Sequence, residues 1–128
     1  MTGYVGLLEN TTGTNTDFRH VLFTGKHLQL VVMCLAPGEE IGNEVHEDVD
    51  QFFRVEQGAA TFVLNEAEEH VIGVGGAVVV PAGTWHNVVN ASSARPVKLY
   101  TIYTPPQHPG GTVHRTRADA EAAEHQPA

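Results

Sequence analysis

Short apolar runs separated by turn-forming residues dominate the chain from residue 21 onward. The runs are rich in β-branched and aromatic side chains, which favour strands, and Gly, Pro or Asn residues stand between them. We therefore expect an all-β chain whose strands form a sandwich or a barrel. The pattern predicts strands over residues 20–24, 27–36, 43–46, 51–57, 60–65, 69–73, 77–80, 85–90 and 97–103.

The two ends of the chain differ from this β-rich middle. Near the C-terminus, Thr116 can cap a short helix through residues 119–123, and no other segment has a helical pattern. Residues 10–16 are polar, and we expect them to be mobile. A length of 128 residues fits one compact domain. We expect an extension over residues 1–19, a barrel over 20–104, and a C-terminal segment over 105–128 whose short helix packs on or near the barrel.

The net charge and the single cysteine limit which kinds of binding partner and which cellular compartment we expect. Seven Lys and Arg residues against fifteen Asp and Glu give a net charge of −8, which repels nucleic acid and anionic membrane surfaces. No apolar run approaches the roughly 20 residues of a membrane span, and the first twenty residues carry no signal-peptide pattern. Cys34 cannot form an internal disulfide. We expect a cytoplasmic protein that binds a small molecule, with neither nucleic acid nor a membrane as partner.

Four side chains with metal-binding groups occur at spacings that can bring them together. Glu44 and His46 are two positions apart on one predicted strand, so both side chains leave the same face. Gln51 opens the next strand, and His86 begins the strand that returns after the turn at residues 81–83. These four groups can therefore converge inside one barrel.

Residues 38–58 and 75–90 resemble the two motifs of the cupin superfamily, commonly written G-x5-H-x-H-x4-E-x6-G and G-x5-P-x-G-x2-H-x3-N. The first motif keeps every spacing and both terminal glycines. However, Glu44 stands where the superfamily usually has its first His, and Gln51 stands where it usually has Glu. The second motif is matched at each fixed position: Gly75, Pro81, Gly83, His86 and Asn90.

The resemblance implies a small single-domain cupin with a double-stranded β-helix, or jelly-roll, barrel and a short C-terminal helix. It also implies one divalent metal held by Glu44, His46, Gln51 and His86. Compared with the usual ligands, one carboxylate is gained and one is lost, so the ligand charge is unchanged. Two imidazoles, a carboxylate and an amide oxygen suit Zn, Fe, Mn, Ni or Co.

A structural polar core without metal is the alternative for these positions, with Glu44 and Gln51 as hydrogen-bonding partners. The metal hypothesis is favoured because an unpaired buried Glu44 would cost several kcal/mol in order of magnitude, which a cation relieves. Degeneration would also leave some of the ligand positions apolar, whereas all four are chelating.

Three further residues are candidates for catalysis. Tyr103 and Tyr100 lie on the last strand and point to opposite faces, so at most one of them lines the interior. Lys26 follows a hairpin turn and can hold an anionic substrate, although an exposed turn lysine is the common case. Asp48 lies between the ligand strands and can serve as acid or base, although a charged loop is more often only solvated.

Three functions fit such a site. The first is an isomerase or lyase whose metal acts as a Lewis acid on a sugar, sugar acid or keto acid, because the donor set is similar to that of metal-dependent mannose-6-phosphate isomerases. The second is an Fe(II)-dependent dioxygenase, because two His and one carboxylate form the ligand triad of non-haem iron oxygenases. The third is a non-catalytic barrel that binds a small ligand. Phe52 faces away from Gln51 on the outer sheet surface, which points to a homodimer.

Overall fold

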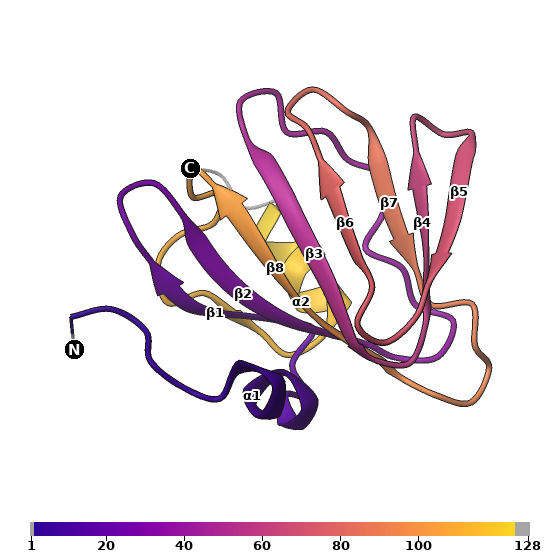
Figure 1. Cartoon of the computed structure of the whole chain (residues 1–128), viewed down its shortest axis with the longest axis horizontal. Helices are drawn as coiled ribbons and strands as arrows, with labels where there is room; N and C mark the ends of the chain where they lie inside the picture. The colour runs from indigo at the N-terminus through magenta and orange to yellow at the C-terminus, as the bar shows by residue number, and fades with distance from the viewer. Residues whose placement is uncertain (1, 125–128) are drawn as a thin grey trace.

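The computed structural model describes residues 2–124 and contains two antiparallel β-sheets with a helix at each end of the chain (Figure 1). The larger sheet has six strands in the order β6-β3-β8-β2-β1-β9, and the smaller sheet has the order β5-β4-β7. The elements are α1 (Leu8–Thr14), β1 (Arg19–Thr24), β2 (Gln29–Leu35), β3 (Asp50–Gln57), β4 (Ala60–Leu64), β5 (Glu68–Ile72), β6 (Ala77–Val80), β7 (His86–Val89), β8 (Val97–Thr104), β9 (Val113–His114) and α2 (Arg117–Glu124).

The core lies between the two sheets. Buried and partly exposed side chains alternate along β3 and β8, as expected where one face of a sheet packs on a core. The rings of Phe53 on β3 and Phe62 on β4 meet edge to face with centroids 5.2 Å apart, and thereby join the two sheets. This arrangement is the jelly-roll barrel that the sequence predicts.

Two fixed positions of the sequence motifs have structural roles. Gly58 has φ +78°, and a Cβ atom there would lie 2.6 Å from the carbonyl oxygen of Pro96, so a side chain does not fit. Asn90 is fully buried, and its Nδ2 lies within hydrogen-bonding distance of the carbonyl oxygens of Leu35, Ala36 and Arg95. Both residues hold chain segments together at the end of a strand and carry no metal-binding role.

The helix α1 was not predicted, because the sequence shows a helical pattern only near the C-terminus, and most of the polar segment 10–16 belongs to this helix. Threonine-rich segments have low intrinsic helix propensity, and Leu7 at the N-cap makes no side-chain capping bond. Tertiary packing compensates, because Thr12 is fully buried where α1 contacts the larger sheet. At the end of the helix, the Lys98 ammonium group on β8 donates a hydrogen bond of 2.8 Å to the Gly13 carbonyl oxygen.

We expect Lys98→Met to loosen α1, because the substitution leaves the last carbonyls of the helix without a cation. The expected loss of unfolding free energy is about 1 kcal/mol. Thermal unfolding and amide hydrogen exchange over residues 11–14 measure the effect. Lys26→Met, at an exposed turn, is the matched control. Unchanged exchange over α1 would contradict the assigned role of Lys98.

The strand predicted over residues 43–46 is replaced by irregular chain. The segment between β2 and β3 meets β7 through two isolated bridges, which pair Glu40 with Val89 and Glu44 with His86, and through a hydrogen bond from the Gly42 N–H to the Asn87 side-chain oxygen. Gly42 interrupts the segment with φ +108°, a conformation outside the strand region. The other predicted strands correspond to strands of the structure, and the short β9, which pairs with β1, was not predicted.

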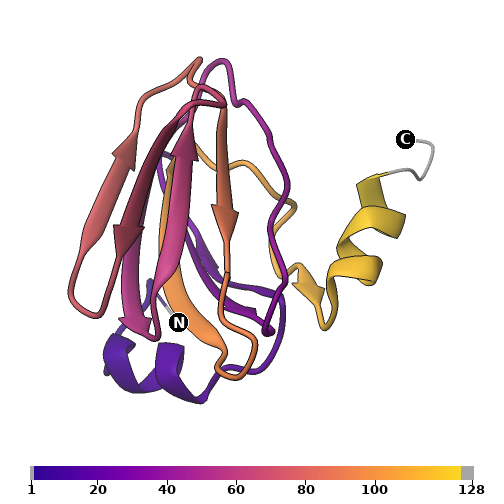
Figure 2. The same ribbon diagram turned by 90° about the vertical axis from the view of Figure 1, so that its right-hand side faces the viewer.

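The predicted C-terminal helix is present as α2, one residue longer at its end and two residues longer at its start. The Thr116 hydroxyl oxygen accepts a hydrogen bond from the Asp119 backbone N–H at 3.1 Å, so the capping prediction is confirmed. Figure 2 shows α2 at one side of the barrel, and its Ala120 is buried. Residues 125–128 of the predicted segment lie outside the described residues. Among residues 2–124, no helix has the length and apolar character needed to cross a membrane.

Candidate metal centre

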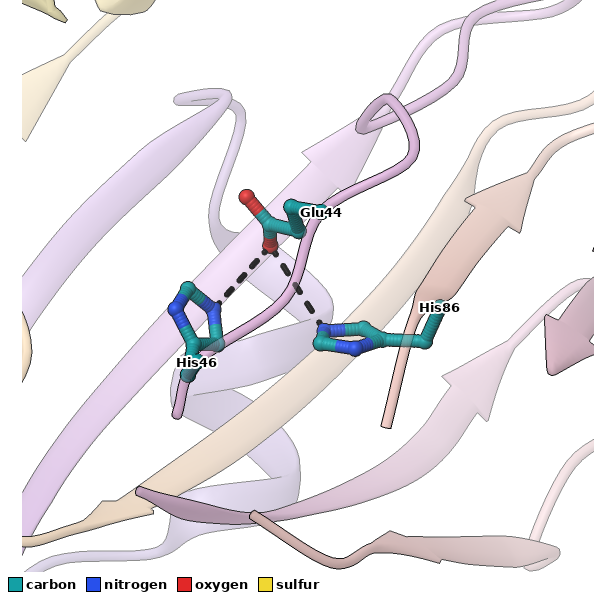
Figure 3. Close-up of side chains that lie close together, drawn as sticks. All are labelled: Glu44, His46 and His86. Atoms are coloured by element: carbon teal, nitrogen blue, oxygen red, sulfur yellow. Dashed lines mark ion pairs between the residues drawn. The ribbon is translucent and has the colours of Figure 1, made fainter. Parts of the chain in front are cut away.

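Glu44, His46 and His86 point toward one another inside the barrel (Figure 3). The Oε1 atom of Glu44 lies 3.4 Å from Nε2 of His46 and 3.7 Å from Nε2 of His86. One donor atom from each residue falls within 4.8 Å of the other two. Ligand atoms held roughly 2.0–2.2 Å from one metal ion lie about 3 to 4 Å apart, so this spacing suits a single cation.

Backbone hydrogen bonds fix the three side chains. The N–H of Glu44 donates to the carbonyl oxygen of His86, and the N–H of His86 donates back to that of Glu44, both at 2.9 Å. The N–H of Gly83, in the turn before β7, donates to the His46 carbonyl oxygen at 2.9 Å. This turn and the Glu44–His86 bridge place all three donors without a regular strand under Glu44 and His46.

The imidazole of His86 is oriented by a second contact. Its Nδ1 lies 3.0 Å from the carbonyl oxygen of Thr84, a contact in which Nδ1–H is the donor. The proton on Nδ1 leaves a lone pair on Nε2, and Nε2 is the atom that faces Glu44. Carbonyl contacts of this kind orient metal-binding histidines in general.

Three proposed ligand atoms are buried without a hydrogen-bond partner among residues 2–124: Nε2 of His46 and of His86 in the cluster, and Oε1 of Gln51 on β3. Such atoms are rare in proteins because burying a polar atom costs desolvation free energy, and no hydrogen bond compensates for that cost. The amide nitrogen of Gln51 donates to the Thr101 hydroxyl at 2.9 Å, which fixes the amide and leaves its oxygen as the free acceptor. All three atoms are metal donors, so the residues present fit a divalent cation.

The ionisation of the site also suits a cation. Burial alone raises the pKa of the Glu44 carboxyl, but the contact with His46 and the charge of His86 outweigh burial and hold this pKa below its usual value. Burial lowers the pKa of the His86 imidazole. At neutral pH the carboxylate is therefore charged and the His86 imidazole neutral, which are the forms that bind metals.

The three catalytic candidates lie in different surroundings. Tyr103 is buried, its ring centroid lies 5.8 Å from that of His46, and burial raises the pKa of its phenol. Tyr100, its neighbour on β8, is only partly buried, so Tyr103 is the tyrosine that lines the interior. Lys26 is exposed in the turn between β1 and β2, and Asp48 is exposed before β3. Neither belongs to the cluster of Glu44 and the two histidines.

Sequence reasoning missed two residues of the interior, Arg19 and His108. Arg19 begins β1 and is only 3% exposed. His108, which is not among the candidate residues of the sequence analysis, lies with Nε2 at 3.3 Å from the Tyr103 hydroxyl. Both residues are outside the two motifs. The alternation along β1, in which Arg19 shares a face with the buried Val21, was the one indication for Arg19.

His108 should make the fold sensitive to acid. Burial, aided by the charge of Arg19, lowers the pKa of His108 from 6.5 to about 3. The unfolded chain therefore binds one more proton than the folded chain between these two pH values, and stability falls as the pH drops through this window. Wild type should lose up to about 1.4 kcal/mol of unfolding free energy per pH unit from this residue, and His108→Leu should lack this contribution. Urea unfolding from pH 7 to pH 4 measures it, with the exposed His27→Leu as control. Equal pH slopes in wild type and His108→Leu would contradict the prediction.

The fold and the site together define a small jelly-roll barrel with a candidate metal centre in its interior. The model of the cupin domain family matches residues 31–103, which contain all of the candidate ligands. The chain belongs to the cupin family.

Two proteins and one solved structure are similar to this chain over most of its length. The uncharacterized protein YrkC of Bacillus subtilis (strain 168) is 48% identical over 126 residues, which cover 94% of this chain and 67% of the relative. The uncharacterized protein L612 of Acanthamoeba polyphaga mimivirus is 43% identical over 112 residues, covering 86% of this chain and 70% of the relative. The crystal structure of BH2720 from Bacillus halodurans has a TM-score of 0.90 and 46% identity, with 93% of each chain covered.

Proposed function

We propose that this cupin binds one divalent transition metal through Glu44, His46, Gln51 and His86, and uses it as a Lewis acid on a small oxygen-rich substrate. The substrate class is a sugar, sugar acid or keto acid, and the reaction class is isomerisation or elimination. One observation carries the proposal: Nε2 of His46 and Nε2 of His86, both buried without hydrogen-bond partners among residues 2–124, cluster with a carboxylate oxygen of Glu44. A divalent cation satisfies all four groups at once.

When bound, the metal supplies positive charge that polarises a substrate carbonyl and makes the neighbouring C–H more acidic. The Glu44 carboxylate offsets part of that charge, and the two imidazoles and the Gln51 amide add none. Tyr103 keeps its proton because burial raises the pKa of the phenol, so its hydroxyl is available as a hydrogen-bond donor to substrate oxygen. We assign this role to Tyr103 ahead of Lys26 and Asp48 because both of these are exposed.

Oxidative chemistry is the second candidate. The cluster of Glu44, His46 and His86 has the composition of the two-histidine, one-carboxylate triad that binds Fe(II) in non-haem oxygenases. In that case Gln51 is a weak fourth ligand that substrate can displace.

One set of measurements separates these functions. Elemental analysis of protein purified without a metal-affinity tag identifies the resident metal. Metal-loaded protein is then mixed with free and phosphorylated aldoses, uronates and keto acids in deuterated water, where isomerase or lyase activity gives product and deuterium incorporation. Oxygen uptake by anaerobically Fe(II)-loaded protein with catechols, thiols and enols supports the oxygenase instead. Ligand binding without turnover in either assay supports a non-catalytic cupin, and absence of any metal overturns the proposal.

We also propose a cytoplasmic homodimer whose partner is a small molecule. The aromatic side chains of Phe52 and Tyr100, with centroids 6.2 Å apart, are only partly buried on the outer face of the larger sheet. Covering this pair in a subunit contact would remove apolar surface from water. Sedimentation velocity of wild type is expected to give a dimer, and Phe52→Asp a monomer. A monomeric wild type would contradict the proposal.

A further inference from the structure

A pocket of about 380 Å³ is lined by Glu44, one of the proposed metal ligands, and by its neighbours 40–43. The other residues that line it lie outside the two sequence motifs. Its walls come from β1, from the irregular segment around Glu44, and from α2. The volume is within the range of small-molecule sites in proteins. Glu44 lines this pocket and also belongs to the cluster with His46 and His86, so the pocket adjoins the candidate metal centre at Glu44.

The pocket is lined by a buried cation, Arg19, whose hydrogen-bonding capacity is only partly used. Arg19 is 3% exposed, its Nη1 contacts Nδ1 of His114 at 3.3 Å, and its Nε is buried without a partner among residues 2–124. A guanidinium group has five N–H donors and no acceptor, and its strongest partners are carboxylates. The charge and the free Nε–H of Arg19 therefore favour an anionic oxygen in the pocket.

A second guanidinium, that of Arg117, lines the same pocket. Arg117, at the start of α2, has its Nη2 at 3.3 Å from the position that a Cβ of Gly42 would take, so the absence of a side chain at Gly42 makes room for it. Nε of Arg117 is buried without a hydrogen bond in the described part of the chain and lies 3.2 Å from a carboxylate oxygen of Glu121. Arg117 is thus partly neutralised, whereas Arg19 forms no ion pair within residues 2–124.

The acidic side chains of the pocket limit the negative charge that a ligand there can carry. Glu40 is partly exposed and Glu124 is exposed, and both line the pocket together with Glu121. Solvated carboxylates at a rim repel highly charged molecules, while the buried Arg19 attracts a single negative group. The combination favours a small monocarboxylate over a phosphate ester.

We propose that Arg19, assisted by Arg117, forms a carboxylate-binding subsite beside the metal centre, and that the ligand of this cupin is a sugar acid or keto acid rather than a neutral sugar. This inference rests on the proposed function, because it narrows the substrate class of the same site. The carboxylate of the ligand pairs with Arg19, and its remaining oxygens point toward Glu44 and the metal ligands.

Glucuronate and glucuronamide form a matched pair of probes, since they differ only in the charge of one group. Isothermal titration of Zn(II)-loaded wild type is expected to show glucuronate bound about tenfold tighter or more. Arg19→Met is expected to remove this preference, and Arg19→Lys to keep part of it. Arg115→Met, at an exposed position, is the control with an unchanged preference.

Circular dichroism shows whether Arg19→Met folds. If it does not, Arg117→Met on α2 is used as the test variant instead. We expect its preference for glucuronate over glucuronamide to fall roughly two- to fivefold, because Arg117 is a partly neutralised cation. Equal affinity of wild type for the two probes, no binding of either, or a full preference in the folded Arg19 or Arg117 variant overturns the subsite. Zinc content is measured separately on the same samples. Wild type without zinc therefore refutes the metal proposal, while its preference between the two probes still tests Arg19.

Discussion

His86→Ala is expected to abolish metal binding. The substitution removes one of two buried imidazole donors and leaves a carboxylate, one imidazole and an amide, which no longer surround a cation. The loss of affinity should exceed the roughly 10- to 100-fold that loss of an outer-shell partner costs. Zinc titration by calorimetry, and metal content after dialysis, measure the effect. His46→Ala should behave in the same way.

Glu44→Gln provides the graded comparison. It keeps an oxygen donor but removes the only anionic ligand, so we expect weakened and not abolished binding. The exposed His70→Ala, on β5, is the matched control for loss of an imidazole. Equal metal stoichiometry in wild type and in all three site variants would refute the ligand assignment.

Phe53→Ala is expected to give the largest loss of stability. The ring is 1% exposed and contacts Phe62 of the other sheet, and its centroid lies 6.1 Å from that of His86. Truncating a buried phenylalanine costs about 3–5 kcal/mol, because the core loses burial and gains a cavity. Urea unfolding followed by circular dichroism gives the value for the metal-free protein.

The neighbouring ring supplies the control for this measurement. Phe52 directly precedes Phe53 on β3 but faces outward and is only partly buried. Phe52→Ala should therefore lower the unfolding free energy much less than Phe53→Ala does. Because Phe53 also supports His86, zinc affinity should fall in Phe53→Ala and stay near wild type in Phe52→Ala. Similar losses of stability in the two variants would contradict the assignment of Phe53 to the core.

The strands were predictable because their composition is a property of the chain itself. The runs over 51–57 and 77–80 correspond closely to β3 and β6, since both are rich in β-branched or aromatic residues and end at turn-forming residues. The convergence of Glu44 and His46 was predicted from strand spacing although no strand forms there. An extended segment held by one bridge to His86 is enough to keep both side chains on one side.

Other features depend on contacts between distant parts of the chain, so local pattern could not reveal them. Residues 8–14 form a helix because of what α1 packs against and because Lys98 reaches its end. His108 lies in the chain between β8 and β9, and its approach to Tyr103 depends on how that chain folds back. The role of Arg19 became visible only when α2 and the Glu44 segment enclosed it.

The irregular segment between β2 and β3 carries two of the proposed ligands, yet it is fastened to β7 by isolated bridges instead of a continuous ladder. Such a segment can swing outward at the expense of a few hydrogen bonds while both sheets stay intact. A cation can therefore be loaded and exchanged without global unfolding. A bound cation would link this segment to the smaller sheet through its ligands. Chelators should therefore increase proteolysis near Gly42 at concentrations that do not yet lower the melting temperature.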